Sequence, residues 1–135
     1  MKAIYIFTIF SIFFFTFSGL NSFAQTAIEE EYQMQQYFMV FLKKGPNRTQ
    51  DSVTALKIQN GHLNNISRLF DEKKLILAGP FLDESEFLGI FILDVPTYGE
   101  AENLVLTDPA VKTGRLAFEI HPWYGPGNIV VQKKE

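Results

Sequence analysis

The alternation of apolar and polar residues along the chain predicts four β-strands. Residues 37–42 and 87–95 are almost continuously apolar, which is typical of strands that are covered on both faces. Residues 75–78 form a shorter apolar run that ends at Gly79-Pro80, and residues 116–121 alternate between apolar and polar positions. The connection at residues 83–86 is polar and short, as in a hairpin, so we expect antiparallel strands on either side of it.

Two other segments repeat their apolar residues at helical spacing. Residues 51–74 predict a long helix with Asp51 or Ser52 as its cap, and residues 98–107 predict a shorter one capped by Thr97. The shorter helix should stop at Asp108, because the residue before a proline is disfavoured in helical geometry. The apolar side chains of the long helix fall within a sector of about 160°, so we expect one face of this helix to be buried. These side chains are Ala55, Leu56, Ile58, Leu63, Ile66, Leu69 and Phe70.

The order of these elements, βαββαβ, predicts an α+β fold. In the ferredoxin-like arrangement of that order, two helices cover one face of a four-stranded antiparallel sheet. Two helices cannot cover both faces, yet the strands at 37–42 and 87–95 carry apolar residues on both. Because an exposed apolar face of that size is unusual on a soluble monomer, we expect a homodimer in which a second copy covers it.

The N-terminal residues have the features of a secretory signal peptide. Lys2 supplies a positive start, residues 3–17 are mainly apolar, and Ser22 and Ala24 are small residues at the −3 and −1 positions of a cleavage site. The alternative is an uncleaved anchor, but the apolar run is shorter than the roughly 20 residues that span a bilayer. We expect cleavage after Ala24 and export to the periplasm or the outside of the cell, without stable membrane insertion afterwards. The predicted organisation is a signal peptide at 1–24, a flexible lead-in at 25–35, a folded domain at 36–124 and a frayed tail at 125–135.

Composition narrows the classes of function. The chain has 135 residues, of which 47% are hydrophobic and 20% charged, with a net charge of −3 and no cysteine. These values describe one globular domain, and the lack of cysteine excludes disulfides, thiolate metal sites and cysteine nucleophiles. The mild acidity disfavours nucleic-acid binding, which depends on Lys and Arg at the phosphates. Two histidines without an H-x-x-x-H spacing do not make a zinc site, so we expect neither a metal nor a cofactor.

His62 is the first candidate for chemistry, because it falls inside the apolar sector of the long helix. One interpretation is a core or interface histidine satisfied by a hydrogen bond, which is the commoner outcome for a lone histidine. The other is a general acid or base, which normally has a carboxylate to orient it. Asp71 shares the helix but lies about 13 Å along the axis and on the far side. Asp108 meets no such obstacle, and it is either a local cap or the partner of His62.

Four further residues are candidate substrate contacts. His121 and Trp123 follow each other closely at the end of the last strand, where an exposed histidine is the alternative. Gly79 and Pro80 end the second strand, and the alternative is that they serve only to terminate regular secondary structure. The loop of residues 43–48 is basic and could attract an anion, but it lacks the glycine spacing of a phosphate loop, so solvated surface charge is the favoured interpretation.

Taken as a set, several short motifs resemble the YCII-related (YciI-like) domain family over residues 36–124. The motifs are Gly61-His62-Leu63, Leu75-Ile76-Leu77-Ala78-Gly79-Pro80-Phe81, Gly89-Ile90-Phe91, Glu100-Ala101, Thr107-Asp108-Pro109-Ala110-Val111, Gly114-Arg115-Leu116 and Pro122-Trp123. The resemblance implies a dimeric α/β barrel with a site centred on His62 and Asp108. Relatives include muconolactone isomerase-like and chloromuconolactone dehalogenase-like enzymes. Members often carry an Arg shortly before the helix histidine, whereas this chain has Lys57-Ile58-Gln59-Asn60 there.

Two functions therefore stay open. The first is an enzyme that uses His62 and Asp108 to transfer a proton on a small organic molecule, in lactone or muconolactone-type isomerisation or elimination. The second is a non-catalytic dimer that binds a small ligand in the same cleft.

Overall fold

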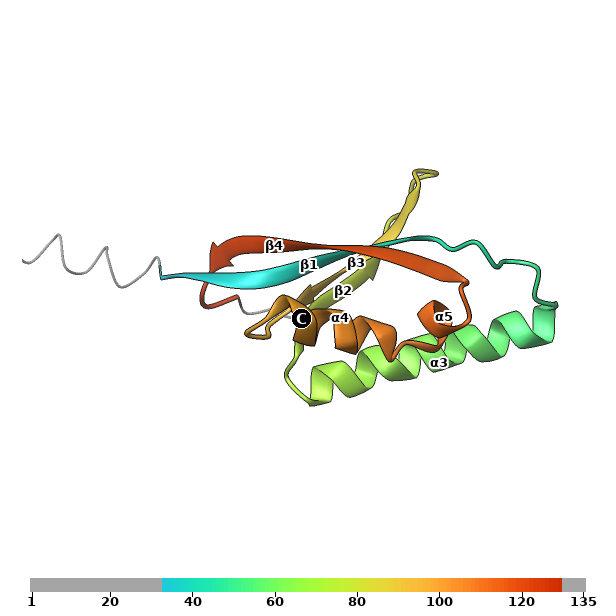
Figure 1. Cartoon of the computed structure of the whole chain (residues 1–135), viewed down its shortest axis with the longest axis horizontal. Helices are drawn as coiled ribbons and strands as arrows, with labels where there is room; N and C mark the ends of the chain where they lie inside the picture. The colour runs from blue at the N-terminus through green and yellow to red at the C-terminus, as the bar shows by residue number, and fades with distance from the viewer. Residues whose placement is uncertain (1–32, 130–135) are drawn as a thin grey trace, which may run out of the picture. The chain divides into compact units, whose positions relative to one another are not determined.

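The computed structural model describes residues 33–129, which form a four-stranded antiparallel sheet with all of their helices on one face (Figure 1). The strand order across the sheet is β2-β3-β1-β4. This confirms the predicted ferredoxin-like fold, with one short helix, α5, added before the last strand. The elements are β1 (Met34–Lys44), α3 (Ser52–Asp71), β2 (Leu75–Pro80), β3 (Phe87–Leu93), α4 (Tyr98–Leu106), α5 (Pro109–Lys112) and β4 (Leu116–Pro126).

The first and last strands of the domain, β1 and β4, are longer than the apolar runs that predicted them. Met34 and Gln35 were expected in the flexible lead-in, and Gly125 and Pro126 in the frayed tail, but all four belong to strands. The reason is mutual pairing, since Met34 lies opposite Pro126 and Gln35 opposite Gly125. Backbone hydrogen bonds need no apolar side chains, so the hydropathy pattern did not reveal this extension. The predicted cleavage after Ala24 lies outside the described residues and stays a prediction.

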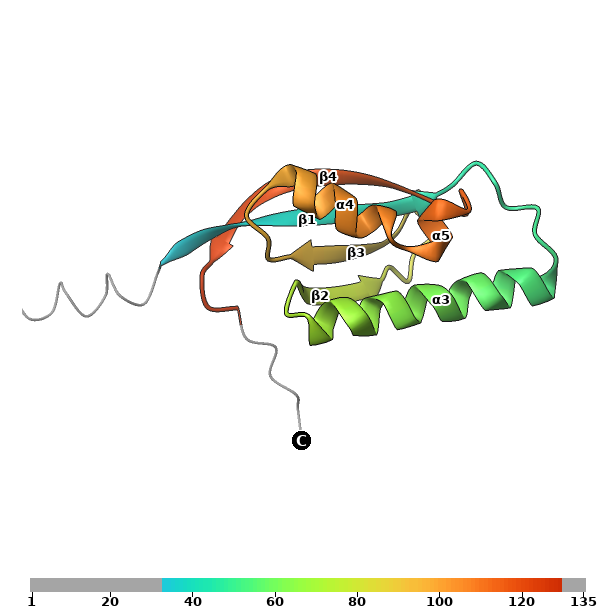
Figure 2. The same cartoon turned by 60° about the horizontal axis from the view of Figure 1, so that its bottom comes forward.

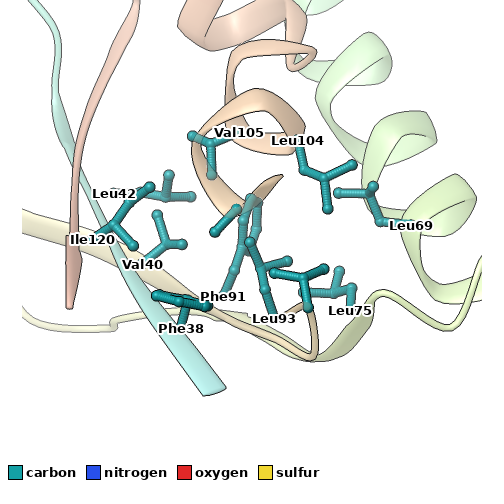
Figure 3. Close-up of a cluster of buried hydrophobic side chains, with 12 residues drawn as sticks. Phe38, Val40, Leu42, Leu69, Leu75, Phe91, Leu93, Leu104, Val105 and Ile120 are labelled. Carbon is teal, nitrogen blue, oxygen red and sulfur yellow. The ribbon is translucent and has the colours of Figure 1, made fainter. Parts of the chain in front are cut away.

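The core fills the layer between the sheet and the helices (Figure 3). Its sheet side consists of alternate residues of the central strands, because every second side chain of a strand points to the same face. Its helix side includes Leu69 of α3 and Leu104 and Val105 of α4. The sheet side includes Phe38, Val40, Leu42, Phe91, Leu93 and Ile120.

Helix α3 buries a narrower stripe than the sequence predicts. Ile58, Asn65 and Leu69 are buried, whereas Leu56, Leu63 and Phe70 of the predicted apolar face are exposed. The helix lies along the β2 side of the sheet, where its main neighbours are β2 and α5 (Figure 2). A helix on the margin of a layer has fewer neighbours, so only part of its apolar sector is covered. In the described part of the chain, no helix is both long and apolar enough to cross a membrane.

The loop after β1 is joined to the turn before β4. The Gly45 N–H donates to Arg115 O at 3.0 Å, and the Asn47 N–H donates to Gly114 O at 2.9 Å. A side chain at Gly45 would place its Cβ only 2.2 Å from Gly114 O, so the two backbones can approach only because residue 45 is glycine. Gly114 itself has a φ of 72°, a left-handed conformation that favours glycine. These contacts hold the residues after β1 beside the start of β4.

Asp51 is the N-cap of α3, as one of the two predicted alternatives. Its carboxylate accepts the Thr54 N–H at 2.9 Å and the Thr54 hydroxyl at 2.8 Å. These hydrogen bonds, the backbone one foremost, lower the pKa of Asp51 because they favour its charged form. A lowered pKa means that the carboxylate stabilises the fold above its ordinary pKa, and that this contribution is lost as the pH falls.

We predict that Asp51→Ala lowers the melting temperature at pH 7 by about 4–8 °C, the usual effect of losing a cap in a domain of this size. The difference from the unmodified protein should narrow as the pH falls below the ordinary aspartate pKa of about 4, where the unfolded chain begins to bind the proton. Thermal unfolding followed by circular dichroism measures both effects. Asp71→Ala is the matched control, because it removes an aspartate from the opposite end of α3, where a negative charge is not stabilising. An equal loss in both variants would contradict the capping role.

Candidate active site

A cavity of about 460 Å³ lies between α3 and the helix-covered face of the sheet. It sits at the end of the sheet where β1 and β2 stop and β3 and β4 begin, because its walls include residues from each of these strand ends. Helix α3 contributes a face at helical spacing, formed by Gln59, His62, Leu63 and Ile66. The volume suits a small organic molecule.

His62 and Asp108 form a hydrogen-bonded pair at this cavity. The His62 Nδ1 atom lies 2.7 Å from Asp108 Oδ2. The His62 side chain is 12% exposed and the Asp108 side chain is fully buried, so the carboxylate lies behind the ring and only the ring meets the cavity. The ring also stacks on Phe91, with 5.9 Å between centroids and 20° between planes.

Asp108 is both a local cap and the partner of His62, which the sequence had suggested as alternatives. Asp108 is the N-cap of α5, and its Oδ1 atom accepts the Ala110 N–H at 2.8 Å. The second oxygen, Oδ2, faces His62. Pro109 occupies the first turn of α5, where its fixed φ suits helical geometry and its missing N–H costs no bond. One carboxylate therefore starts a helix and orients an imidazole.

Gly61 allows α3 to approach α5 closely enough for this pair. A Cβ at position 61 would lie 3.0 Å from Pro109 Cγ, which is closer than ordinary van der Waals contact. A glycine inside a helix costs about 0.5–1 kcal/mol relative to alanine. Its benefit here is the short distance between the helix that carries His62 and the turn that carries Asp108.

The hydrogen bond determines which ring nitrogen is available for chemistry. An ionised carboxylate can only accept hydrogen bonds, so beside an ionised Asp108 the hydrogen between the two groups lies on Nδ1 of His62. In the neutral ring, Nε2 then keeps its lone pair. No hydrogen bond occupies Nε2 among residues 33–129, and the ring borders the cavity. This is the arrangement of an oriented general base.

A buried amide contacts the same carboxylate oxygen as His62. Asn65 Nδ2 lies 3.4 Å from Asp108 Oδ2, while Asn65 Oδ1 accepts the Arg68 Nη2 hydrogen at 2.8 Å. Arg68 Nη2 also lies 2.9 Å from the Thr107 hydroxyl, and Arg68 Nη1 donates to Glu72 at 2.7 Å. Because the guanidinium can only donate, it fixes the amide with its NH₂ group toward Asp108. The sequence analysis missed Asn65, since it treated the buried face of α3 as apolar.

The structure separates the other candidate residues into two groups. Gly79 and Pro80 line the cavity, as expected for substrate contacts. His121 and Trp123 do not, because they pair with Met39 and Tyr37 and point to the opposite face of the sheet. The His121 side chain is 58% exposed, which matches the alternative of a surface histidine.

Trp123 packs on that opposite face. Its ring covers Tyr37, with 5.7 Å between centroids, and lies directly over Gly125. The Tyr37 hydroxyl donates to Pro126 O at 2.7 Å, and burial, with a smaller contribution from Asp94, raises the pKa of Tyr37. Trp123 thus shields a buried tyrosine instead of meeting the cavity. Asp71 forms no bond with His62 either, in agreement with the helical geometry.

Two arginines line the cavity, and neither was proposed as a site residue. Arg48 belongs to the basic loop that was interpreted as solvated surface charge, and Arg115 precedes β4. Gln59 of α3 also lines the cavity, whereas Lys57 does not and is exposed. Within residues 33–129, no cluster of three or more His, Asp or Glu side chains is arranged to hold a metal ion.

We predict that replacing Asp108 by Asn reverses the tautomer of His62. The amide can donate its N–H to Nδ1, which would move the ring hydrogen to Nε2. Nitrogen-15 chemical shifts of the imidazoles, recorded above neutral pH, distinguish the two forms. His121 provides a control in the same spectrum, because its contacts do not involve Asp108. A protonated Nε2 on neutral His62 of the unmodified protein would contradict the orientation described here.

Comparison with known proteins places this chain in a family. The profile of the YCII-related domain matches residues 36–124, which is about two thirds of the chain. No curated protein sequence matches the chain. Among solved structures, the chain is similar to 5-chloro-2-hydroxyhydroquinone dehydrochlorinase (TftG) from Burkholderia phenoliruptrix AC1100, in complex with 2,5-dihydroxybenzoquinone. That similarity has a TM-score of 0.50 and 20% identity, and it covers 64% of this chain and 92% of the dehydrochlorinase. His62 and Asp108 of this chain lie within the residues that match the profile, and the chain belongs to the YCII-related domain family.

Proposed function

We propose that this protein is a small-molecule enzyme in which His62 transfers a proton and Asp108 orients the histidine ring. The observation that carries the proposal is the 2.7 Å contact between the His62 Nδ1 and Asp108 Oδ2 atoms at the wall of the cavity. A histidine that merely filled the core would not line a cavity. The similarity to a dehydrochlorinase supports an enzyme-like role, although that activity is stated only for the similar protein.

The geometry supports a simple sequence of proton transfers. His62 Nε2 takes a proton from a carbon or hydroxyl of the substrate, and the electron pair stays on the substrate. The ring becomes an imidazolium, whose charge is stabilised by Asp108 through Nδ1. In an isomerisation, Nε2 returns the proton to another atom of the substrate. In an elimination, the electron pair expels a leaving group and the proton passes to solvent. Lactone or muconolactone-type substrates suit either course.

The alternative is a protein that binds a small ligand without changing it. Much of the cavity wall is apolar, with Leu42, Ile66 and Phe91 among its residues. Such a wall would bind an apolar molecule by burial alone. The two functions differ in one measurable respect, since only the enzyme exchanges protons between ligand and solvent.

We predict that the protein accelerates exchange of carbon-bound hydrogens for deuterium in 2,5-dihydroxybenzoquinone or muconolactone dissolved in D₂O. Proton NMR follows the loss of signal. Replacing His62 by Gln should slow the exchange by about 10²–10⁴-fold, the usual contribution of a general base, and Asp108→Asn should also slow it. Asp71→Asn is the matched control, because Asp71 makes no contact with His62. Binding of both compounds without exchange in the unmodified protein would support the ligand-binding alternative.

We also propose that the protein forms a homodimer through the face of the sheet that lacks helices. Figure 1 shows this face uncovered, with the loop between β2 and β3 rising from it. Its side chains alternate with those of the core, and most are only partly buried. The apolar members include Met39, Phe41, Leu77, Ile90, Ile92 and Trp123. A second copy would bury this area, as expected for apolar sheet faces.

Phe41→Asp should therefore convert a dimer into a monomer, because a carboxylate in the centre of the interface would be buried without a partner. Light scattering at micromolar concentration measures the mass. Val53→Asp is the control, because Val53 lies in the first turn of α3 and is 77% exposed. A monomer mass for the unmodified protein would overturn the dimer.

A further inference from the structure

We infer that the cavity binds a small organic anion, and that Arg48 and Arg115 hold its charged oxygens. This inference rests on the proposed function, since it concerns the same cavity. The chemical class is a compact molecule with an apolar body and a carboxylate or an enolate at one end. The argument depends on the hydrogen bonds of the two guanidinium groups and on the charges of the cavity wall.

Both arginines line the cavity, yet neither is neutralised. Arg48 Nη1 donates to the backbone oxygen of Arg115 at 3.0 Å, and Arg115 Nη1 donates to Gln50 Oε1 at 2.9 Å. Both acceptors are uncharged, and neither guanidinium forms a salt bridge within residues 33–129. A guanidinium has five N–H donors, so most of the donors of each group stay available.

The other cationic side chains of the described residues either are paired or lie away from the cavity, since Lys44, Lys57, Lys73 and Lys112 do not line it. Lys43 lies 2.6 Å from Glu119 on the opposite face of the sheet, and this hydrogen bond raises the pKa of Lys43. Lys74 lies 2.9 Å from Glu100. Arg68 is bonded to Glu72, Asn65 and Thr107. The two arginines therefore bring positive charge to one cavity without a negative partner, and an anionic ligand would neutralise that charge.

The backbone holds the two arginines in place before any ligand binds. The loop that carries Arg48 is bonded to the turn that carries Arg115 through Gly45 and Asn47. The Asn47 side chain adds a further bond to Thr113 O at 3.0 Å. A site that is already ordered loses less conformational entropy on binding, so its hydrogen bonds contribute more to affinity.

The charge of the cavity wall is positive, although the whole chain carries −3. No Asp or Glu of the described residues lines the cavity, and Asp108, which contacts His62, is fully buried and already paired. A concave surface with one sign of charge and low-dielectric walls concentrates ions of the opposite sign. Leu42, Phe91 and Leu116 supply the apolar part of the wall. Arginine is suited to carboxylates because its planar fork can donate two parallel hydrogen bonds.

The test compares benzoate with benzamide, a neutral molecule of nearly the same shape, by isothermal titration calorimetry. The unmodified protein should bind benzoate at least about tenfold more tightly, since hydrogen bonds between charged groups are stronger than those between neutral groups. Arg48→Gln and Arg115→Gln should each weaken benzoate binding by about tenfold or more and leave benzamide binding unchanged. Lys57→Gln is the matched control, because it removes a positive charge from the exposed side of α3 and should change benzoate binding by less than about twofold.

Three further measurements make the outcomes distinct. Arg48→Lys and Arg115→Lys keep the charge and should bind benzoate more tightly than the Gln variants, which separates loss of charge from loss of folding. Titration of the unmodified protein with 2,5-dihydroxybenzoquinone in its enolate form distinguishes enolate from carboxylate recognition. Asp71→Asn should bind benzoate as the unmodified protein does, because Asp71 does not line the cavity.

The result also separates this inference from the proposed function. If the arginine variants lose benzoate but no compound exchanges its protons, the anion site stands and the proposed enzyme is wrong. If exchange occurs and both Gln variants bind benzoate normally, the enzyme stands and the anion site is wrong. Equal binding of benzoate and benzamide, or no benzoate binding at about 10 mM, would also overturn the anion site.

Discussion

The carboxylate of Asp108 is fully buried, and each of its oxygens has a different partner. A buried charge without partners would cost several kcal/mol, so the surroundings of Asp108 must supply hydrogen bonds. The backbone of α5 supplies one through Ala110, and α3 supplies the other through His62. Two helices that are distant in sequence are thereby held to one side chain. The position of the imidazole at the cavity follows from the need to satisfy this carboxylate.

Several other features are explained by the same requirement. Gly61 lets α3 approach Pro109, and Asn65 offers its NH₂ group to the carboxylate with Arg68 fixing the amide. No buried side-chain polar atom is left without a hydrogen bond within residues 33–129. The polar groups beneath the site therefore form a complete network. Such a network holds a catalytic group more firmly than a single bond does, because each member limits the rotation of the next.

Some of these features could be predicted from sequence, and others could not. The strands, the two longer helices and the cap at Asp51 follow from hydropathy periodicity and cap chemistry. The proximity of His62 to Asp108 follows from the wheel and the Asp-Pro break, together with the family resemblance. Helix α5 has four residues, which is too short to show a period. Its absence from the prediction also hid how Asp108 could act as cap and partner at once.

The orientation of the β4 side chains and the presence of Arg48 and Arg115 at one cavity were harder to predict. Ile120 is buried against the helices, so the adjacent His121 must point to the opposite face. The alternation of residues 116–121 separates Ile120 from His121, but it does not reveal which face of the sheet borders the cavity. Arg48 and Arg115 are 67 residues apart in sequence, and only the backbone contacts of Gly45 and Asn47 bring them to one cavity. Contacts between loops leave no periodic signal in the sequence.

The pairing of β1 with β4 has a consequence for how the chain folds. β1 lies between β3 and β4, and its first residue, Met34, pairs with Pro126. The first strand of the domain therefore cannot obtain its second neighbour until almost the entire domain has been synthesised. Contacts of such long range slow folding, because a large loop must close before they stabilise anything. A nascent chain that ends before β4 would present one bare edge of its central strand, so we expect this domain to complete its sheet only after β4 has emerged from the ribosome.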